Sequence, residues 1–202
     1  TITMTNDIRV LDDLNIASGK SLTASSGNLL VGGDWTNAGT FNHGGGTVTL
    51  NGTALQVVTA GGSAFNRLVQ TNASVGGVRY ADGFTTAYLT NTTANSLMTF
   101  AAGATYNITA AGGLNLAGAA GQEVRLRSTV PGSFWYINPA GGGWTANYLN
   151  VQDSVNLHAD PIYPTNSTNA GNTINWFSVD TDNDGDEIAD WWELLYYPDR
   201  TN

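Results

Sequence analysis

"GNLLVGGDWTNAGTFNHGGGTVTLNGT", residues 27–53, contains short apolar clusters separated by turns that are rich in Gly and Asn. The clusters are NLLV at 28–31, GTF at 39–41 and TVTL at 47–50. TVTL alternates strictly between polar and apolar residues, which is the period of a β-strand. Gly and Asn suit tight turns because both adopt left-handed backbone conformations easily. The stretch therefore predicts short strands joined by tight corners.

The same pattern extends from Ile8 to about Trp176. Further clusters follow one another at a spacing of about 7 to 12 residues, which is typical of an all-β protein. They include LNI at 14–16, SLT at 21–23, LQVV at 55–58, LMTF at 97–100 and VRLR at 124–127.

Two all-β architectures fit this spacing. A β-sandwich or jelly roll normally has strands of about five or six residues. The clusters here are shorter, and Gly-rich corners such as those at 44–46 and 141–143 recur along the chain. Short strands with tight corners favour a β-solenoid, in which each coil stacks on the previous one. We therefore favour the solenoid and keep the sandwich as the alternative.

The stretch at 27–53 also resembles coils of the right-handed parallel β-helices in large secreted bacterial surface proteins, which are similar to the filamentous-haemagglutinin and autotransporter-passenger types. Residues 124–154 and 169–177 look like the last coils of the same architecture. The resemblance implies a right-handed parallel β-helix in a secreted protein at the bacterial cell surface. It says little about activity, since β-helices serve as adhesins, fibres and enzymes.

Charge divides the chain in two. Residues 1–179 carry eight acids and six bases, whereas residues 180–202 carry eight acids and one base. Neither part offers a basic surface, so nucleic acid is not an expected partner.

The chain has no Cys, which rules out disulfides and Cys-based metal sites. No apolar run reaches the length of a membrane span.

Seven of the sixteen acids lie in DTDNDGDEIADWWE at 180–193, which we call the acidic segment. Its spacing matches a calcium loop of the EF-hand kind in two registers. A loop that begins at Asp180 has Trp191 at its last position, which cannot bind a metal. A loop that begins at Asp182 fills every ligand position but has Glu187 where Gly is easiest. We favour this register, in which the ligands are Asp182, Asp184, Asp186, the Ile188 carbonyl, Asp190 and Glu193.

The acidic segment also resembles the calcium-binding repeats similar to thrombospondin type 3 repeats that occur near the ends of many bacterial surface proteins. It departs from them at Glu187, where they have Gly, and at Ala189, where they have Pro. The resemblance implies that Asp182, Asp184, Asp186, Asp190 and Glu193 bind Ca²⁺. The alternative is a solvated acidic tail, although close carboxylates repel one another unless a cation lies among them. We expect 189–197 to form a short helix after the loop, and metal binding to drive its folding.

Aromatic residues concentrate between Phe134 and Phe177. The simplest interpretation is a hydrophobic plug that closes one end of the solenoid, because an open coil exposes strand edges and an apolar core. The alternatives are an assembly face and a sugar-stacking platform. Trp135 and Trp144 are the candidate stacking residues of such a platform.

No catalytic motif of the serine-hydrolase or zinc-protease kind is present. His43 and His158 lie in turn-like sequences, so we expect them to be surface turn residues. The acids of the body are scattered, and Arg125 and Arg127 share a strand face with Glu123 as the nearby acid. We therefore expect a protein that is not an enzyme, although a distant carboxylate pair of the glycosidase kind stays open.

These observations divide the chain into three parts. Residues 1–13 form an N-terminal strand that could exchange with a neighbour by β-augmentation, 14–177 form the solenoid, and 178–202 form the calcium loop and helix. The expected function is that of an extracellular structural subunit. Copies of the chain would associate end to end into a homo-polymer that forms a filament, sheath or fibre. The alternative is an adhesin module that binds polysaccharide. Asn51, Asn72, Asn91, Asn107 and Asn166 lie in glycosylation sequons.

Overall fold

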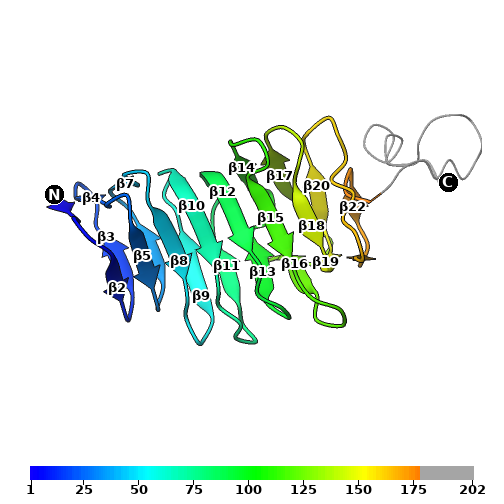
Figure 1. Ribbon diagram of the computed structural model, residues 1–202, viewed down its shortest axis with the longest axis horizontal. Helices are drawn as coiled ribbons and strands as arrows, with labels where there is room; N and C mark the ends of the chain where they lie inside the picture. Colours follow the sequence, from blue (N-terminus) through cyan, green and yellow to red (C-terminus); the bar gives the residue numbers. More distant parts are fainter. Residues whose placement is uncertain (178–202) are drawn as a thin grey trace, which may run out of the picture.

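A computed structural model of the chain describes residues 1–177. Within that range the regular secondary structure consists of strands two to seven residues long, joined in parallel ladders. Each strand pairs with strands one turn earlier and one turn later, so the chain winds into a solenoid of about eight turns (Figure 1). The prediction of an all-β solenoid is confirmed. The sandwich alternative is wrong, because sandwiches are built from antiparallel strands.

The strands fall into three sheets. The first sheet contains β1 (Ile2–Thr3), β4 (Ser21–Thr23) and β7 (Thr40–Asn42). The second contains β2 (Ile8–Val10), β5 (Asn28–Val31), β8 (Thr47–Leu50), β10 (Phe65–Gln70), β12 (Thr85–Asn91), β14 (Thr105–Ile108), β15 (Leu114–Ala117), β17 (Trp135–Pro139), β18 (Thr145–Asn147), β20 (Ser154–Asn156) and β22 (Thr173–Ile174). The third contains β3 (Leu14–Ile16), β6 (Trp35–Asn37), β9 (Gln56–Thr59), β11 (Val78–Tyr80), β13 (Leu97–Phe100), β16 (Val124–Ser128), β19 (Leu149–Val151) and β21 (Thr168–Asn169).

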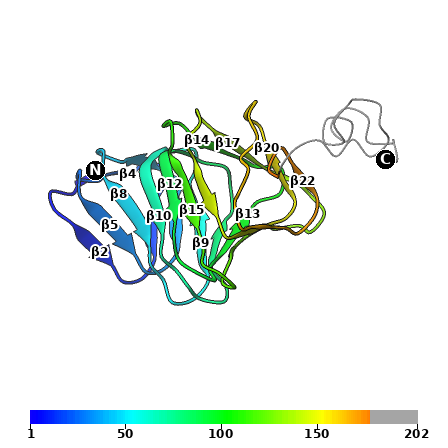
Figure 2. The same ribbon diagram turned by 45° about the vertical axis from the view of Figure 1, so that its right-hand side comes forward.

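Turn length is nearly constant in the first half of the solenoid, increases in the middle and decreases again to 18 and 19 residues in the last turn. In the second sheet Leu29 pairs with Val48, which pairs with Leu68, which pairs with Leu89, so that the turns advance by 19, 20 and 21 residues. In the third sheet Met98 pairs with Leu126, an advance of 28 residues. The extra residues of the later turns form loops, among them a tight turn closed by a bridge between Ala119 and Gln122. Figure 2 shows the successive turns stacked side by side.

Inward side chains form columns along the solenoid axis, because strands alternate their side chains between two faces. Aromatic rings form one continuous column in which neighbouring ring centroids are 4.0–6.1 Å apart. Its members are Trp35, Phe41, Phe65, Phe84, Tyr106, Phe100, Trp135 and Trp176. These rings and the adjacent aliphatic columns make up the hydrophobic core.

Buried amides hold the corners between the second and third sheets. Gln56 Nε2 donates to the carbonyls of Val31 and Gly33, at 2.9 and 2.6 Å, in the preceding turn. Its Oε1 accepts from the Gly52 backbone N–H at 2.7 Å and from Asn72 Nδ2 at 3.0 Å. Such amides satisfy backbone groups that a sharp corner takes out of the strand ladders.

Asparagine has two roles at the corners of the solenoid. Four of the seven non-Gly residues with positive φ in the described range are Asn. Others lie inside the corners, where Asn72 and Asn91 are fully buried and bond to neighbouring backbone or side-chain groups. These two sequons therefore cannot carry a glycan in the folded chain.

The N-terminal segment joins the first turn of this chain's own solenoid. Ile2 and Thr3 of β1 pair with β4, and β2 pairs with β5. The strand ladders of the solenoid therefore begin before residue 14, whereas the solenoid was expected from the sequence to begin at residue 14. Exchange of residues 1–13 with a neighbour stays a prediction.

Candidate functional site

The predicted calcium site lies outside the described residues. Its ligands are Asp182, Asp184, Asp186, Ile188, Asp190 and Glu193, and the expected helix that leaves the loop spans 189–197. Within residues 1–177 no group of three or more His, Cys, Asp or Glu side chains could hold a metal ion. In the same range no helix has the length and hydropathy of a membrane-spanning segment.

Several acids of the body stabilise the turns. Asp13 Oδ1 accepts the backbone N–H of Asp34 at 2.7 Å, and Asp34 Oδ1 accepts that of Val57 at 2.8 Å, so that two carboxylates link three successive turns. Asp82 accepts the N–H groups of Ala60 and Gly61, at 2.7 and 2.8 Å. These carboxylates satisfy backbone donors that the corners leave without ladder partners.

Both histidines have a local role in a turn. The Nδ1 atom of His43 accepts the N–H of Gly45, and that of His158 accepts the N–H of Asp160, each at 3.0 Å. The Asp160 carboxylate lies 3.7 Å from His158 Nδ1.

Trp135 does not form a surface platform. It is fully buried, its ring stacks on Phe100 at a centroid distance of 4.0 Å, and its Nε1 donates to the Gln152 carbonyl at 3.1 Å. Trp176 is equally buried and donates to Ser154 Oγ at 2.8 Å. Trp144 is half-buried and meets His158 edge to face. The two most buried rings of the cluster thus belong to the core.

The N-terminal end of the solenoid is open. A cavity of about 390 Å³ lies there, with apolar walls that include Ile2, Met4, Ile8 and Leu22. Ile8 is 39% exposed, although it begins a column whose next member, Leu29, is 2% exposed. The cavity is the uncovered end of the hydrophobic core.

A second concave site lies on the outer face of the third sheet. This polar cleft, as we call it, has a volume of about 360 Å³ and is lined by Asn95, Glu123, Arg125, Tyr148, Asn150 and Asn166, with Ala120 and Gly121 beside them. Arg125 of β16 pairs in register with Asn150 of β19, and Asn150 pairs with Thr168 of β21. Stacking of coils therefore gathers polar side chains from several turns at one place.

Charges in the polar cleft are unevenly paired. Glu123 accepts from Asn150 Nδ2 at 2.9 Å and from Thr168 Oγ1 at 2.7 Å. Arg127, one outward position further along β16, donates to the Asn150 carbonyl at 2.7 Å and to its side-chain oxygen. Arg125 Nε is buried and has no hydrogen-bond partner among residues 1–177. Burial, and after it the charge of Arg125, lower the pKa of Arg127.

Sequence reasoning found only part of these two sites. The sequence placed Arg125 and Arg127 on one strand face near Glu123, but these residues were considered only as evidence against a catalytic site. Tyr148 and Asn166 come from later coils, and nothing in the sequence gives their register against β16. An exposed strand was predicted at the N-terminal end, whereas the cavity there depends on how β1 to β5 enclose it.

Comparisons of the chain with protein-family models, with curated proteins and with solved structures find no match. Its function must therefore be argued from its own geometry and chemistry.

Proposed function

We propose that this chain is a non-catalytic structural protein whose solenoid lengthens by end-to-end stacking on a second copy of the same chain. The observation that carries the proposal is the open apolar cavity of about 390 Å³ at the N-terminal end. Exposed strand edges and an uncovered core favour the addition of further strands.

The register of the first turn supports stacking in particular. Ile8 pairs with Leu29, which pairs with Val48, and Ile2 pairs with Leu22, which pairs with Phe41. Ile2 is 68% exposed, whereas Phe41, two positions further along its column, is 4% exposed. A stacked coil with apolar residues at the matching positions would continue both columns and bury this surface.

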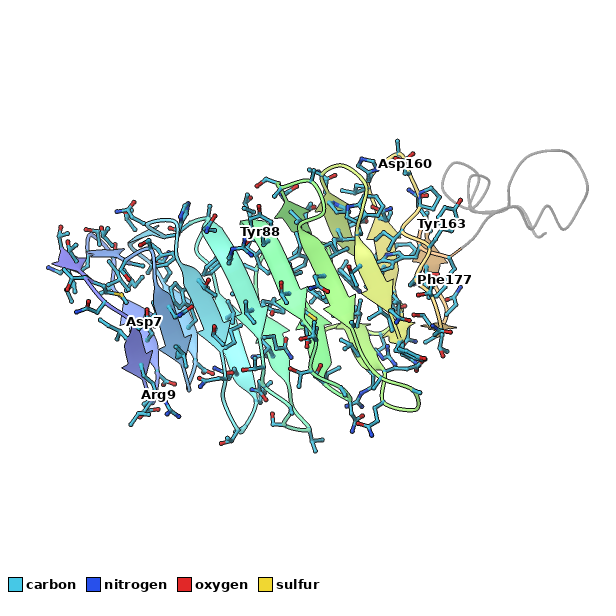
Figure 3. The ribbon with its side chains drawn as sticks, viewed as in Figure 1. Asp7, Arg9, Tyr88, Asp160, Tyr163 and Phe177 are labelled. Atoms are coloured by element: carbon cyan, nitrogen blue, oxygen red, sulfur yellow. The ribbon has the colours of Figure 1, made fainter. Side chains whose placement is uncertain are left out.

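The far end of the described solenoid is chemically different from the N-terminal one. At this end the N–H groups of Ile162 and Tyr163 donate to the carbonyls of Asn175 and Trp176. Tyr163, Phe177 and Asp160 lie at this end, opposite Asp7 and Arg9 at the N-terminal end (Figure 3). Two unlike ends favour head-to-tail contacts, which produce open polymers when the rotation does not close a ring.

Calcium enters the proposal from the sequence alone. The spacing of Asp182, Asp184, Asp186, Asp190 and Glu193 supports a calcium loop that would fold the C-terminal part and orient the junction between copies. The resemblance to bacterial β-helix proteins supports a right-handed solenoid and an extracellular location at the cell surface.

Sedimentation of the purified chain over a concentration series, with calcium and then with chelator, tests the proposal. We expect concentration-dependent oligomers in calcium and elongated particles by negative-stain electron microscopy. Ile8→Lys should give monomers, because it places a charge in the apolar cavity. Leu11→Lys is the matched control, since Leu11 is 75% exposed in the same coil and does not line the cavity. A wild-type chain that stays monomeric with calcium at every concentration would overturn the proposal.

A further inference from the structure

The polar cleft contains a cation without an acceptor. Arg125 Nε is buried and lacks a partner among the described residues, and the described part of the chain holds no carboxylate within ion-pair distance of its guanidinium. Glu123 lines the same cleft, but its two carboxylate oxygens accept from Asn150 and Thr168. A buried donor without an acceptor is costly, so Arg125 is suited to an acceptor that comes from outside the chain.

The backbone around the cleft is strained. Three of its lining residues, Asn95, Tyr148 and Asn166, have φ values of 57°, 50° and 51°. Asn tolerates this left-handed conformation, whereas a bulky aromatic residue rarely adopts it. Strain of this kind persists where surrounding structure enforces it, and it often accompanies ligand sites. Tyr148 lines the cleft together with Arg125.

The chemistry of the lining defines the class of ligand. A guanidinium binds a carboxylate through two parallel hydrogen bonds, and asparagine amides both donate to and accept from hydroxyl groups. A tyrosine offers an apolar ring face together with a polar tip. The cleft volume of about 360 Å³ lies in the range of small-molecule sites, at its lower end.

We propose that the polar cleft binds a carboxylate-bearing sugar, such as a uronic acid residue, with its carboxylate on Arg125 and its hydroxyls on the asparagine amides. The cleft lies on the outer face of the third sheet, so it stays accessible when copies stack end to end. This site is independent of the proposed self-assembly, and either can fail without the other.

The test is a titration of the isotope-labelled chain with glucuronate, glucose and acetate, followed by the NMR signal of the Arg125 Nε–H group and the nearby amides. We expect glucuronate to shift these signals and to bind at least about tenfold more tightly than glucose, because a charge-assisted pair is lost with the uncharged sugar. Arg125→Met should abolish the shifts of the nearby amides. Arg79→Met is the matched control, because Arg79 is an exposed outward residue of β11 in the same sheet and does not line the cleft.

Three results would overturn the proposal. The first is the absence of cleft shifts with glucuronate, and the second is unchanged glucuronate binding in a folded Arg125→Met variant. The third is equal affinity for acetate and glucuronate, which would leave a carboxylate contact without recognition of the sugar.

Discussion

Replacement of Gln56 by Met tests whether buried amides hold the solenoid corners together. Gln56 is 1% exposed and joins groups of two successive turns. Met has nearly the same length and volume, so the change removes the hydrogen bonds and leaves little cavity. The variant isolates the polar contribution of the corner.

The expected loss follows from the groups that Gln56 leaves behind. The Gly52 N–H, which is buried, and the partly exposed Gly33 carbonyl lose the partner that the structure gives them. Val31 keeps a second bond, because its carbonyl also accepts the Asn51 N–H at 3.1 Å. A buried polar group without a hydrogen-bond partner costs about 1–3 kcal/mol, and Gln56→Met leaves two groups without this partner. Part of the cost is offset, because Met has no amide that must be desolvated when the chain folds. We expect Gln56→Met to lower the free energy of unfolding by about 2–4 kcal/mol.

Urea denaturation followed by Trp fluorescence and by circular dichroism measures this change. Coincidence of the two transitions checks that a single free energy describes unfolding, which stacked coils do not guarantee. Gln122→Met is the control, since Gln122 is exposed and should change stability by less than about 0.5 kcal/mol. If the Gln56→Met variant is as stable as this control, the buried amides do not stabilise the corners and the reasoning is refuted.

Three further outcomes are expected. Gly77→Ala should cost more than about 3 kcal/mol in urea denaturation, because Gly77 has a φ of 58° and a Cβ there would lie 2.1 Å from the Leu97 carbonyl oxygen. Gly45→Ala, with a φ of 79° and nothing within 4 Å, should cost about 1 kcal/mol, and equal losses would contradict the steric argument. Burial raises the pKa of Tyr80 and Tyr106, so their contribution to stability is complete below pH about 10 and falls above it by about 1.4 kcal/mol per pH unit for each residue. Replacing both by Phe should flatten the alkaline decline in melting temperature, and an unchanged decline would contradict this. Calcium added to the chelator-treated chain should increase the helical circular-dichroism signal as the acidic segment folds, whereas an identical spectrum would count against a calcium loop.

The local sequence pattern was sufficient to locate several of the strands. NLLV at 28–31 and LMTF at 97–100 coincide with β5 and β13. Buried and more exposed residues alternate along both strands, because inward positions need apolar side chains wherever coils stack. The strands β6 (WTN) and β11 (VRY) were not among the clusters singled out, although the three-residue clusters LNI and SLT coincide with β3 and β4.

The candidate sites were only partly visible in the sequence. Side-chain types marked Arg125, Arg127 and Glu123, but the cleft forms because turns of unequal length bring Tyr148 and Asn166 beside them. Trp135 illustrates the opposite case. As a sequence feature it fitted a hydrophobic plug best, with a sugar platform as an alternative, and its burial against Phe100 places it in the core.

The sequence by itself determined the class of fold, the repeated alternation of short strands with Gly and Asn corners, and the acidic segment with its calcium-like spacing. These are local properties, set by backbone conformations and by the two-residue period of a strand. Only the tertiary structure decided which residues stack on one another. Register between coils depends on loop lengths and on contacts between residues about twenty or more positions apart. For that reason the open apolar end and the unpaired Arg125 emerge from the packed solenoid and not from any single stretch of the chain.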